Sequence, residues 1–360
     1  MTEALKAPFP WFGGKRRVAD IVWDALGDCG HYVEPFAGSL AVLLAGEPGR
    51  LETVNDRDCY VANFWRALKS APDEVAEHAC DPVNEADLFA RHLWLVSEGR
   101  ARVDRLNADP DFYDAKVAGW WVWGQCAWIG SGWCSGAGPW KTDRKRPHLG
   151  DEGQGVNRKR PHLGDEGQGV NRKLPHLGDE GRGVNRQLPH LGNEGQGGRR
   201  DEIAAYMRRL AARLERVRVC CGDWSRVVTS GATSYPREGH VGIFLDPPYL
   251  AEVRTGDLYS TDDANVAHEV REWAIANGDD PRLRIVLAGY EDEHAARMPA
   301  SWRVHAYSAS KAYGTRLDKG GQNAANRHKE RLWFSPACVG GWGASGHGNA
   351  AGPLFCLEAS

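Results

Sequence analysis

The stretch Val241-Gly-Ile-Phe-Leu-Asp246-Pro247-Pro248-Tyr249 gives the strongest evidence for the fold. Its first five residues form a continuous apolar run, which is typical of a strand covered on both faces. Five further apolar runs are short and bounded by turn residues, and helical patterns follow most of them. They are HYVEPFA (31–37), RLETVND (50–56), RVRVCCGD (216–223), LRIVLAGY (283–290) and ERLWFSP (330–336). This alternation predicts a doubly wound α/β sheet with ligands at the carboxyl ends of its strands.

The end of the 241–249 stretch has a chemistry of its own. Two consecutive prolines remove two backbone N–H donors and keep their carbonyl acceptors. Asp246 adds a carboxylate acceptor, and Tyr249 offers a flat ring for stacking. Such a set suits an exocyclic amine on an aromatic base, because it can hold both amine hydrogens and turn the nitrogen lone pair towards an electrophile. The structural alternative is a Pro-rich turn after a strand.

A second motif, His31-Tyr-Val-Glu34-Pro-Phe36-Ala-Gly38-Ser39, predicts a strand and a turn of small residues, followed by an apolar helix at AVLLA (41–45). Gly38 allows a backbone to approach a ligand closely. Asp56 follows about twenty residues after the strand, where a carboxylate can accept hydrogen bonds from ribose. Because the motif lacks a row of glycines for phosphates, we expect a nucleoside ligand without them.

A third motif, Pro8-Phe9-Pro10-Trp11-Phe12-Gly13-Gly14-Lys15, supplies a tight glycine turn, a cation and an aromatic surface. Alone it indicates only a turn before a helix. Together, however, PFPWFGGK, YVEPFAGS, VND, CGDW and DPPY resemble, in this order, the successive motifs of the Dam-type (alpha-group) adenine-N6-specific DNA methyltransferases. The resemblance covers residues 7–69 and 200–335.

This resemblance implies a Rossmann-like sheet of the S-adenosylmethionine-dependent methyltransferases, mixed and mostly parallel, with helices on both faces and an inserted target-recognition subdomain. It implies site-specific methyl transfer from S-adenosyl-L-methionine to N6 of adenine in double-stranded DNA, without a metal. The target base would be flipped and held by Asp246, Pro247, Pro248 and Tyr249. The implied cofactor residues are Trp11, Lys15, Glu34, Phe36 and Gly38 for the methionine part, Asp56 for the ribose and Asp223 for the adenine.

Two other functions remain open on the sequence. N4-methylation of cytosine, or amino-methylation of RNA, would need the same acceptors around the amine. A non-catalytic DNA-binding relative would keep the fold without the chemistry, but the intact Asp246-Pro-Pro-Tyr249 and Lys15 argue against it. The order of the family motifs favours adenine in DNA as the substrate. The enzyme would act either alone or beside a partner restriction nuclease.

The composition divides the chain into parts. We expect the catalytic domain at 1–69 and 201–337, a target-recognition insertion at 70–145, and a disordered Gly-rich tail at 338–360. Four tandem copies of a 14-residue unit, which begin at Arg146, Arg160, Leu174 and Leu188, fill residues 146–200. The first two copies offer one Leu each, the last two offer two each, and three copies have one Val, which is too little apolar surface to offset the entropy of ordering. We interpret the repeats as a flexible insertion, with a basic arm on DNA as the alternative.

Basic residues after the repeats are candidates for phosphate contacts. The 201–217 segment predicts an amphipathic helix with Ile203, Tyr206, Leu210 and Leu214 facing inward. The candidate contacts on DNA are Arg208, Arg209, Arg213, Arg327 and Lys329. A solvated helix face is the alternative. For the Trp-rich 120–141 stretch, packing in a core is favoured over stacking on bases.

The overall composition fits a soluble cytoplasmic enzyme, which we expect to be a monomer. The formal charge is −3, so any nucleic-acid surface must be local. The chain has no run of apolar residues long enough for a membrane span. The nine cysteines are irregularly spaced, without a CxxC pair. Their spacing argues against a disulfide framework and a zinc site.

Overall fold

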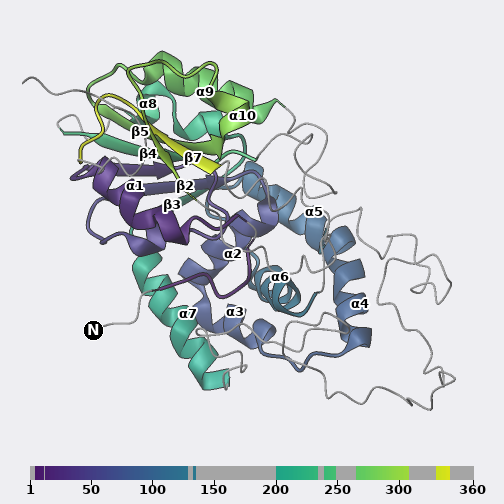
Figure 1. The fold of residues 1–360 in the computed structure, drawn as a ribbon. Helices are drawn as coiled ribbons and strands as arrows, with labels where there is room; N and C mark the ends of the chain where they lie inside the picture. The colour runs from purple at the N-terminus through teal and green to yellow at the C-terminus, as the bar shows by residue number, and fades with distance from the viewer. Residues whose placement is uncertain are drawn as a thin grey trace, which may run out of the picture.

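The computed structural model describes residues 5–11, 13–128, 133–134, 200–233, 239–248, 265–307 and 330–340. Within these ranges a seven-stranded sheet lies against helices on both sides (Figure 1). The strands are β1 (His31–Glu34), β2 (Leu51–Asp56), β3 (Val217–Cys221), β4 (Val241–Leu245), β5 (Leu283–Tyr290), β6 (Arg303–Ala306) and β7 (Glu330–Phe334). Each of the six predicted runs therefore contains a strand.

The strand order is β3-β2-β1-β4-β5-β7-β6. Neighbours from β3 to β5 are parallel, and β7 is antiparallel to both β5 and β6. The prediction of a mixed, mostly parallel sheet is confirmed. The edge strand β6 was not predicted, because its sequence, RVHA, is short and lacks a continuous apolar run.

The order places β1 between β2 and β4, so the chain leaves β1 in one direction and later returns on its other side. His31 pairs with Leu51 of β2 and also with Val241 of β4. In open α/β sheets, ligands bind at the carboxyl ends of strands where the order reverses in this way. The candidate residues Glu34, Asp56 and Asp246 lie at this edge, each at the end of a strand or directly after it.

Side chains alternate between the two faces of the sheet, as the two-residue period of a strand requires. Phe244 and Val286 belong to one buried cluster, while Ile243 and Leu287 belong to another on the opposite face. The first face is covered by α1 (Ala19–Leu26) and α2 (Cys59–Ser70), and the second by α9 (Val266–Asn277). The predicted cover of helices on both faces is confirmed.

The remaining helices extend the first face into a helical layer (Figure 1). They are α3 (Pro72–Ala79), α4 (Glu85–Trp94), α5 (Arg100–Val103), α6 (Ala115–Ala127) and α7 (Arg200–Leu214), with a π-helix at Leu95–Gly99. Shorter elements are the 3-10 helices Arg16–Val18, Leu43–Ala45, Asp104–Asn107 and Trp224–Val227, and the single-turn helices α8 (Ser230–Thr233) and α10 (Glu291–His294).

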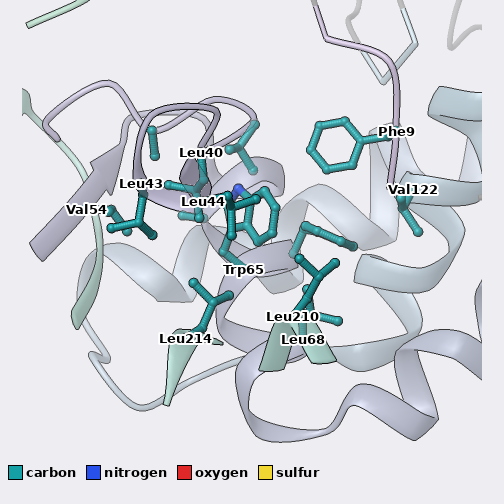
Figure 2. Close-up of a cluster of buried hydrophobic side chains, with 14 of the residues drawn as sticks. Phe9, Leu40, Leu43, Leu44, Val54, Trp65, Leu68, Val122, Leu210 and Leu214 are labelled. Carbon is teal, nitrogen blue, oxygen red and sulfur yellow. The ribbon is translucent and has the colours of Figure 1, made fainter. Parts of the chain in front are cut away.

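The helical layer and the sheet share one hydrophobic core. In Figure 2, Val54 of β2, Trp65 of α2, Val122 of α6 and Leu210 of α7 belong to a single buried cluster. Helix α6 is apolar around its whole circumference, as expected of a buried helix, and Trp121 and Trp123 are fully buried in it. The interpretation of these tryptophans as core residues is confirmed.

Two predictions concern helices near the sheet. The amphipathic helix after the repeats is α7, and Ile203, Tyr206, Leu210 and Leu214 are buried as predicted. The predicted apolar helix at AVLLA (41–45) is wrong, since this segment forms only the 3-10 turn Leu43–Ala45. Gly46 and Pro48 follow at once, and a longer helix has no room to form before them.

Several predicted features lie outside the described residues. They are the 14-residue repeats, most of the tail, Tyr249, Arg327 and Lys329. None of the described helices combines the length and the apolar character that crossing a membrane requires.

Candidate functional site

A small pocket lies at the carboxyl ends of β1 and β4, where the strand order reverses. Six of the residues predicted from the motifs line it, although they come from three separate segments. They are Trp11, Lys15, Glu34, Phe36, Gly38 and Asp246. The other lining residues are Gly13, Gly14, Ala37, Ser39, Ala41 and Phe244. The fold therefore brings the N-terminal glycine turn, the end of β1 and the end of β4 into one place.

Lys15 and Asp246 form an ion pair across this pocket. Lys15 Nζ lies 3.0 Å from Asp246 Oδ1 and also donates a hydrogen bond to the Gly13 carbonyl at 3.0 Å. The Lys15 side chain is only 4% exposed and that of Asp246 is 22% exposed. A buried ammonium requires a nearby anion, because burial alone disfavours its charge. Asp246 therefore supplies the counter-ion for Lys15 and keeps one edge of its carboxylate towards solvent.

Glu34 is the buried acid of the pocket. Its carboxylate accepts a hydrogen bond from the Tyr32 hydroxyl at 3.0 Å, and the residue is 3% exposed. The pKa of Glu34 is raised to about 8, mainly by burial and in part by the nearby charge of Asp246, against the opposing effect of the Tyr32 hydrogen bond. The pocket thus contains two carboxyl groups in different environments, one deeply buried and one beside a lysine.

The turn after β1 brings backbone close to an aromatic ring. Gly38 has a φ of +45°, and a Cβ at this position would lie 2.6 Å from Trp11 Nε1. The Gly38 carbonyl accepts a hydrogen bond from Trp65 Nε1 at 2.8 Å, which ties the turn to α2. Any other residue at position 38 would displace Trp11, so the glycine is required for the close contact.

Asp56 at the end of β2 supports the same turn. Its Oδ2 accepts from the Gly38 N–H at 2.9 Å, and its Oδ1 accepts from the Asp58 N–H at 2.8 Å. A carboxylate accepts hydrogen bonds from N–H and O–H donors alike, and the O–H donors include ribose hydroxyls. Asp56 is half-buried and does not line the small pocket, but it is bonded directly to a residue that does.

Asn55 is a positioning residue that the sequence analysis missed. Its Nδ2 donates to the carbonyls of Pro35 at 3.1 Å and Gly222 at 3.0 Å, and its backbone carbonyl accepts from the Ala37 N–H at 2.8 Å. It therefore links the loops that follow β1 and β3. The signal was present in the VND motif, where a polar side chain ends an otherwise apolar strand and needs a partner when buried.

Asp223 lies after β3, on the far side of β2 from the pocket, and is exposed. Its Oδ1 accepts from the N–H of Ser225 at 3.0 Å and from its hydroxyl at 2.5 Å, which caps the short helix Trp224–Val227. Trp224 stacks on Phe36 with ring centroids 6.2 Å apart and an angle of 28°. This stack was missed too, although CGDW contains the tryptophan, because only the fold brings it to Phe36.

The basic residues of α7 are not a continuous basic face. Arg213 is wrong as a candidate DNA contact, because its side chain is 6% exposed and donates to both carboxylate oxygens of Glu52, at 2.6 and 2.8 Å. Arg208 is exposed but pairs with Asp73 at 2.7 Å, and Arg209 lies over the Tyr206 ring. Within the described ranges, no group of three or more His, Cys, Asp or Glu side chains could hold a metal ion.

Part of the chain matches a known family of proteins. Residues 11–94 match the model of the D12 class N6 adenine-specific DNA methyltransferases. The match confirms the resemblance seen in the motifs, and it contains Trp11, Lys15, Glu34, Gly38 and Asp56. No curated protein matches the chain.

Proposed function

We propose, from the D12-class match of residues 11–94, that this chain is an S-adenosylmethionine-dependent methyltransferase acting on N6 of adenine in double-stranded DNA. The observation that carries the proposal is the contact of Lys15 with Asp246. Asp246 lies outside the matched segment, yet it reaches the pocket that this segment forms. The acceptor residue and the family motif therefore support the same site independently.

The residues present suit the parts of the cofactor. Its methionine end carries an ammonium and a carboxylate, and the pocket offers the acid Glu34 and the cation Lys15. Asp56 offers a carboxylate, a group that accepts hydrogen bonds from ribose hydroxyls, and the Phe36–Trp224 stack offers aromatic faces to an adenine ring. When bound, S-adenosylmethionine supplies an electrophilic methyl group on its sulfonium.

The protein's part in the transfer is to hold the amine. Asp246 would accept one hydrogen of the target N6 amine, and the Pro247 carbonyl would accept the other. With both hydrogens held, the nitrogen lone pair turns towards the methyl group. Lys15 holds the Asp246 carboxylate in place through their ion pair at 3.0 Å. Pro248 stiffens the loop, and Tyr249 would stack on the flipped base.

The target-recognition part would include helices α3 to α6, which follow β2 and α2 in the chain and of which α3 and α4 lie within the matched residues 11–94. Helix α3 packs on α2 and α7, α5 and α6 pack on α2, and α4 packs on α6, so the layer belongs to the same core as the pocket. We propose that DNA lies across the carboxyl edge of the sheet, between this helical layer and the loop after β4.

Nucleoside analysis of DNA tests the function. After incubation with protein and S-adenosylmethionine, we expect N6-methyladenine, and N4-methylcytosine alone would contradict the adenine assignment. Asp246→Asn keeps the shape of the side chain but replaces one acceptor by a donor, so we expect methyl transfer to fall about a hundredfold or more with cofactor binding retained.

Asp280→Asn is a matched control for this variant. Asp280 is a partly exposed aspartate that pairs with Arg282 just before β5, at the opposite edge of the sheet. We expect this replacement to leave methyl transfer unchanged. Unchanged transfer in Asp246→Asn would refute the role of Asp246.

A further inference from the structure

Two cysteine thiols are in contact next to Asp56, a carboxylate proposed to bind the cofactor. Cys59, the first residue of α2, and Cys221, the last residue of β3, have their sulfur atoms 3.5 Å apart. They are 3% and 6% exposed, respectively. The eight cysteines in the described part of the chain are free thiols, and this is a close pair among them. Neither residue belongs to the site described above.

The surroundings make Cys59 the more reactive member of the pair. The hydrogen bond from the Cys221 thiol lowers the pKa of Cys59 against the opposing effect of burial, and the charge of Arg100 lowers it further. Asn107 Nδ2 also donates to the Cys59 sulfur at 3.5 Å. In addition, Cys59 begins a 12-residue helix whose N-terminal dipole favours a thiolate. Asn107 is exposed and contacts both sulfur atoms. The thiol pair therefore lies next to a residue at the surface.

We propose that Cys59 and Cys221 form a reversible disulfide when the protein meets hydrogen peroxide, and that this bond weakens cofactor binding. The Cys59 thiolate attacks one peroxide oxygen and becomes a sulfenic acid, and the second oxygen leaves as water. The Cys221 thiol then displaces the hydroxyl as a second water. In total, two thiols lose two electrons and two protons, and hydrogen peroxide is reduced to two waters.

The backbone connects this bond to Asp56 and Asp223, the two carboxylates proposed to bind the cofactor. Cys221 pairs with Asp56 in the sheet, and the Gly222 N–H donates to the Asp56 carbonyl at 3.1 Å. The residue before Cys59 is Asp58, whose N–H holds Asp56 Oδ1 at 2.8 Å. A disulfide needs the sulfur atoms about 2.05 Å apart, so α2 and β3 must approach each other. That movement would shift the Asp58 N–H and the loop that carries Asp223.

Peptide mapping tests the bond itself, and this readout does not depend on the proposed function. The whole chain is treated with hydrogen peroxide, alkylated and digested without reductant. We expect a linked peptide pair containing Cys59 and Cys221, a loss of two free thiols, and reversal by dithiothreitol. Cys80→Ser, which removes a half-buried thiol away from the pair, should form the same link. Absence of the linked pair in the wild-type protein would overturn the proposal.

Calorimetry with S-adenosylmethionine tests the consequence, which rests on the proposed function. We expect oxidation to raise the Kd about fivefold or more in the wild-type protein and in Cys80→Ser, but not in Cys59→Ser or Cys221→Ser. A linked protein whose Kd is unchanged would overturn the effect on binding. A reduced protein that binds no S-adenosylmethionine would instead contradict the proposed function, while the peptide map would still report on the disulfide.

Discussion

Glu34 combines burial with a second acid in the same pocket. Of the contributions to its pKa, burial is the largest, and it raises the value to about 8, so the side chain is mainly protonated at neutral pH. In the unfolded chain its pKa returns to the ordinary value for Glu, near 4.5. The folded form therefore binds one more proton than the unfolded form between these two values, and the contribution of Glu34 to stability decreases as pH rises through this window.

Glu34→Gln mimics the protonated acid and removes this dependence. We expect the variant to gain stability relative to wild type as pH rises from 5 to 8, by at most about 1.4 kcal/mol per pH unit, with no further gain above the folded pKa. Urea unfolding at a series of pH values measures the difference. Parallel curves for the two proteins would show that Glu34 ionises normally in the fold.

Motifs predicted the reactive residues of the site better than the residues that support them. Lys15 and Glu34 could be predicted from the motifs that resemble the family, and Asp246 because its charge ends an apolar run. Tyr32 and Asn55 could not be assigned their roles, because their hydrogen bonds join parts of the chain that only the fold brings together. The same holds for the direct contact of Lys15 with Asp246, 231 positions along the chain.

Helix α7 shows how one amphipathic pattern can be interpreted in two ways. Its apolar positions were predicted correctly, because helical spacing alone decides which side faces the core. The pattern could not distinguish the buried arginine from the exposed one. The acids that pair with them, Glu52 and Asp73, come from β2 and α3. Arg213 is a structural residue that joins α7 to the sheet, whereas Arg208 remains on the surface.

Replacing each arginine separates these two roles. Arg213→Ala leaves Glu52 buried without its partner, and we expect a loss of about 3–5 kcal/mol in the free energy of unfolding. Arg208→Ala removes an exposed pair with Asp73, and we expect a loss of at most about 1 kcal/mol. Denaturant unfolding compares the two variants with wild type. Equal losses would mean that the pair Arg213–Glu52 is not a buried contact in solution.

At the scale of the whole molecule, the sheet was predictable and its helical layer was not. Six apolar runs indicated the strands, and the strand count failed only at the short edge strand β6. The packing of α3 to α6 depends on contacts of α6 with both α2 and α3, and on Phe9 lying against Trp121 and Phe64. These are long-range contacts, which no local pattern encodes.

Deletion of residues 146–199 tests the interpretation of the repeats at this scale. Because their composition offers little apolar surface, we expect the shortened protein to keep its Tm, its affinity for S-adenosylmethionine and its methylation of DNA. Differential scanning calorimetry and nucleoside analysis measure these properties. If Tm and cofactor affinity persist while methylation of DNA is lost, the repeats contribute to DNA binding.

The position of β1 between β2 and β4 also affects how the protein is made. During synthesis, β1 and β2 leave the ribosome together, but β4 begins 185 residues after the end of β2. At about 5–20 residues per second, the free edge of β1 waits roughly 10–40 seconds for its second partner. An unpaired strand edge can pair with other chains during that time. Folding yield should therefore depend on chaperones and on translation speed more strongly than the stability of the finished protein does.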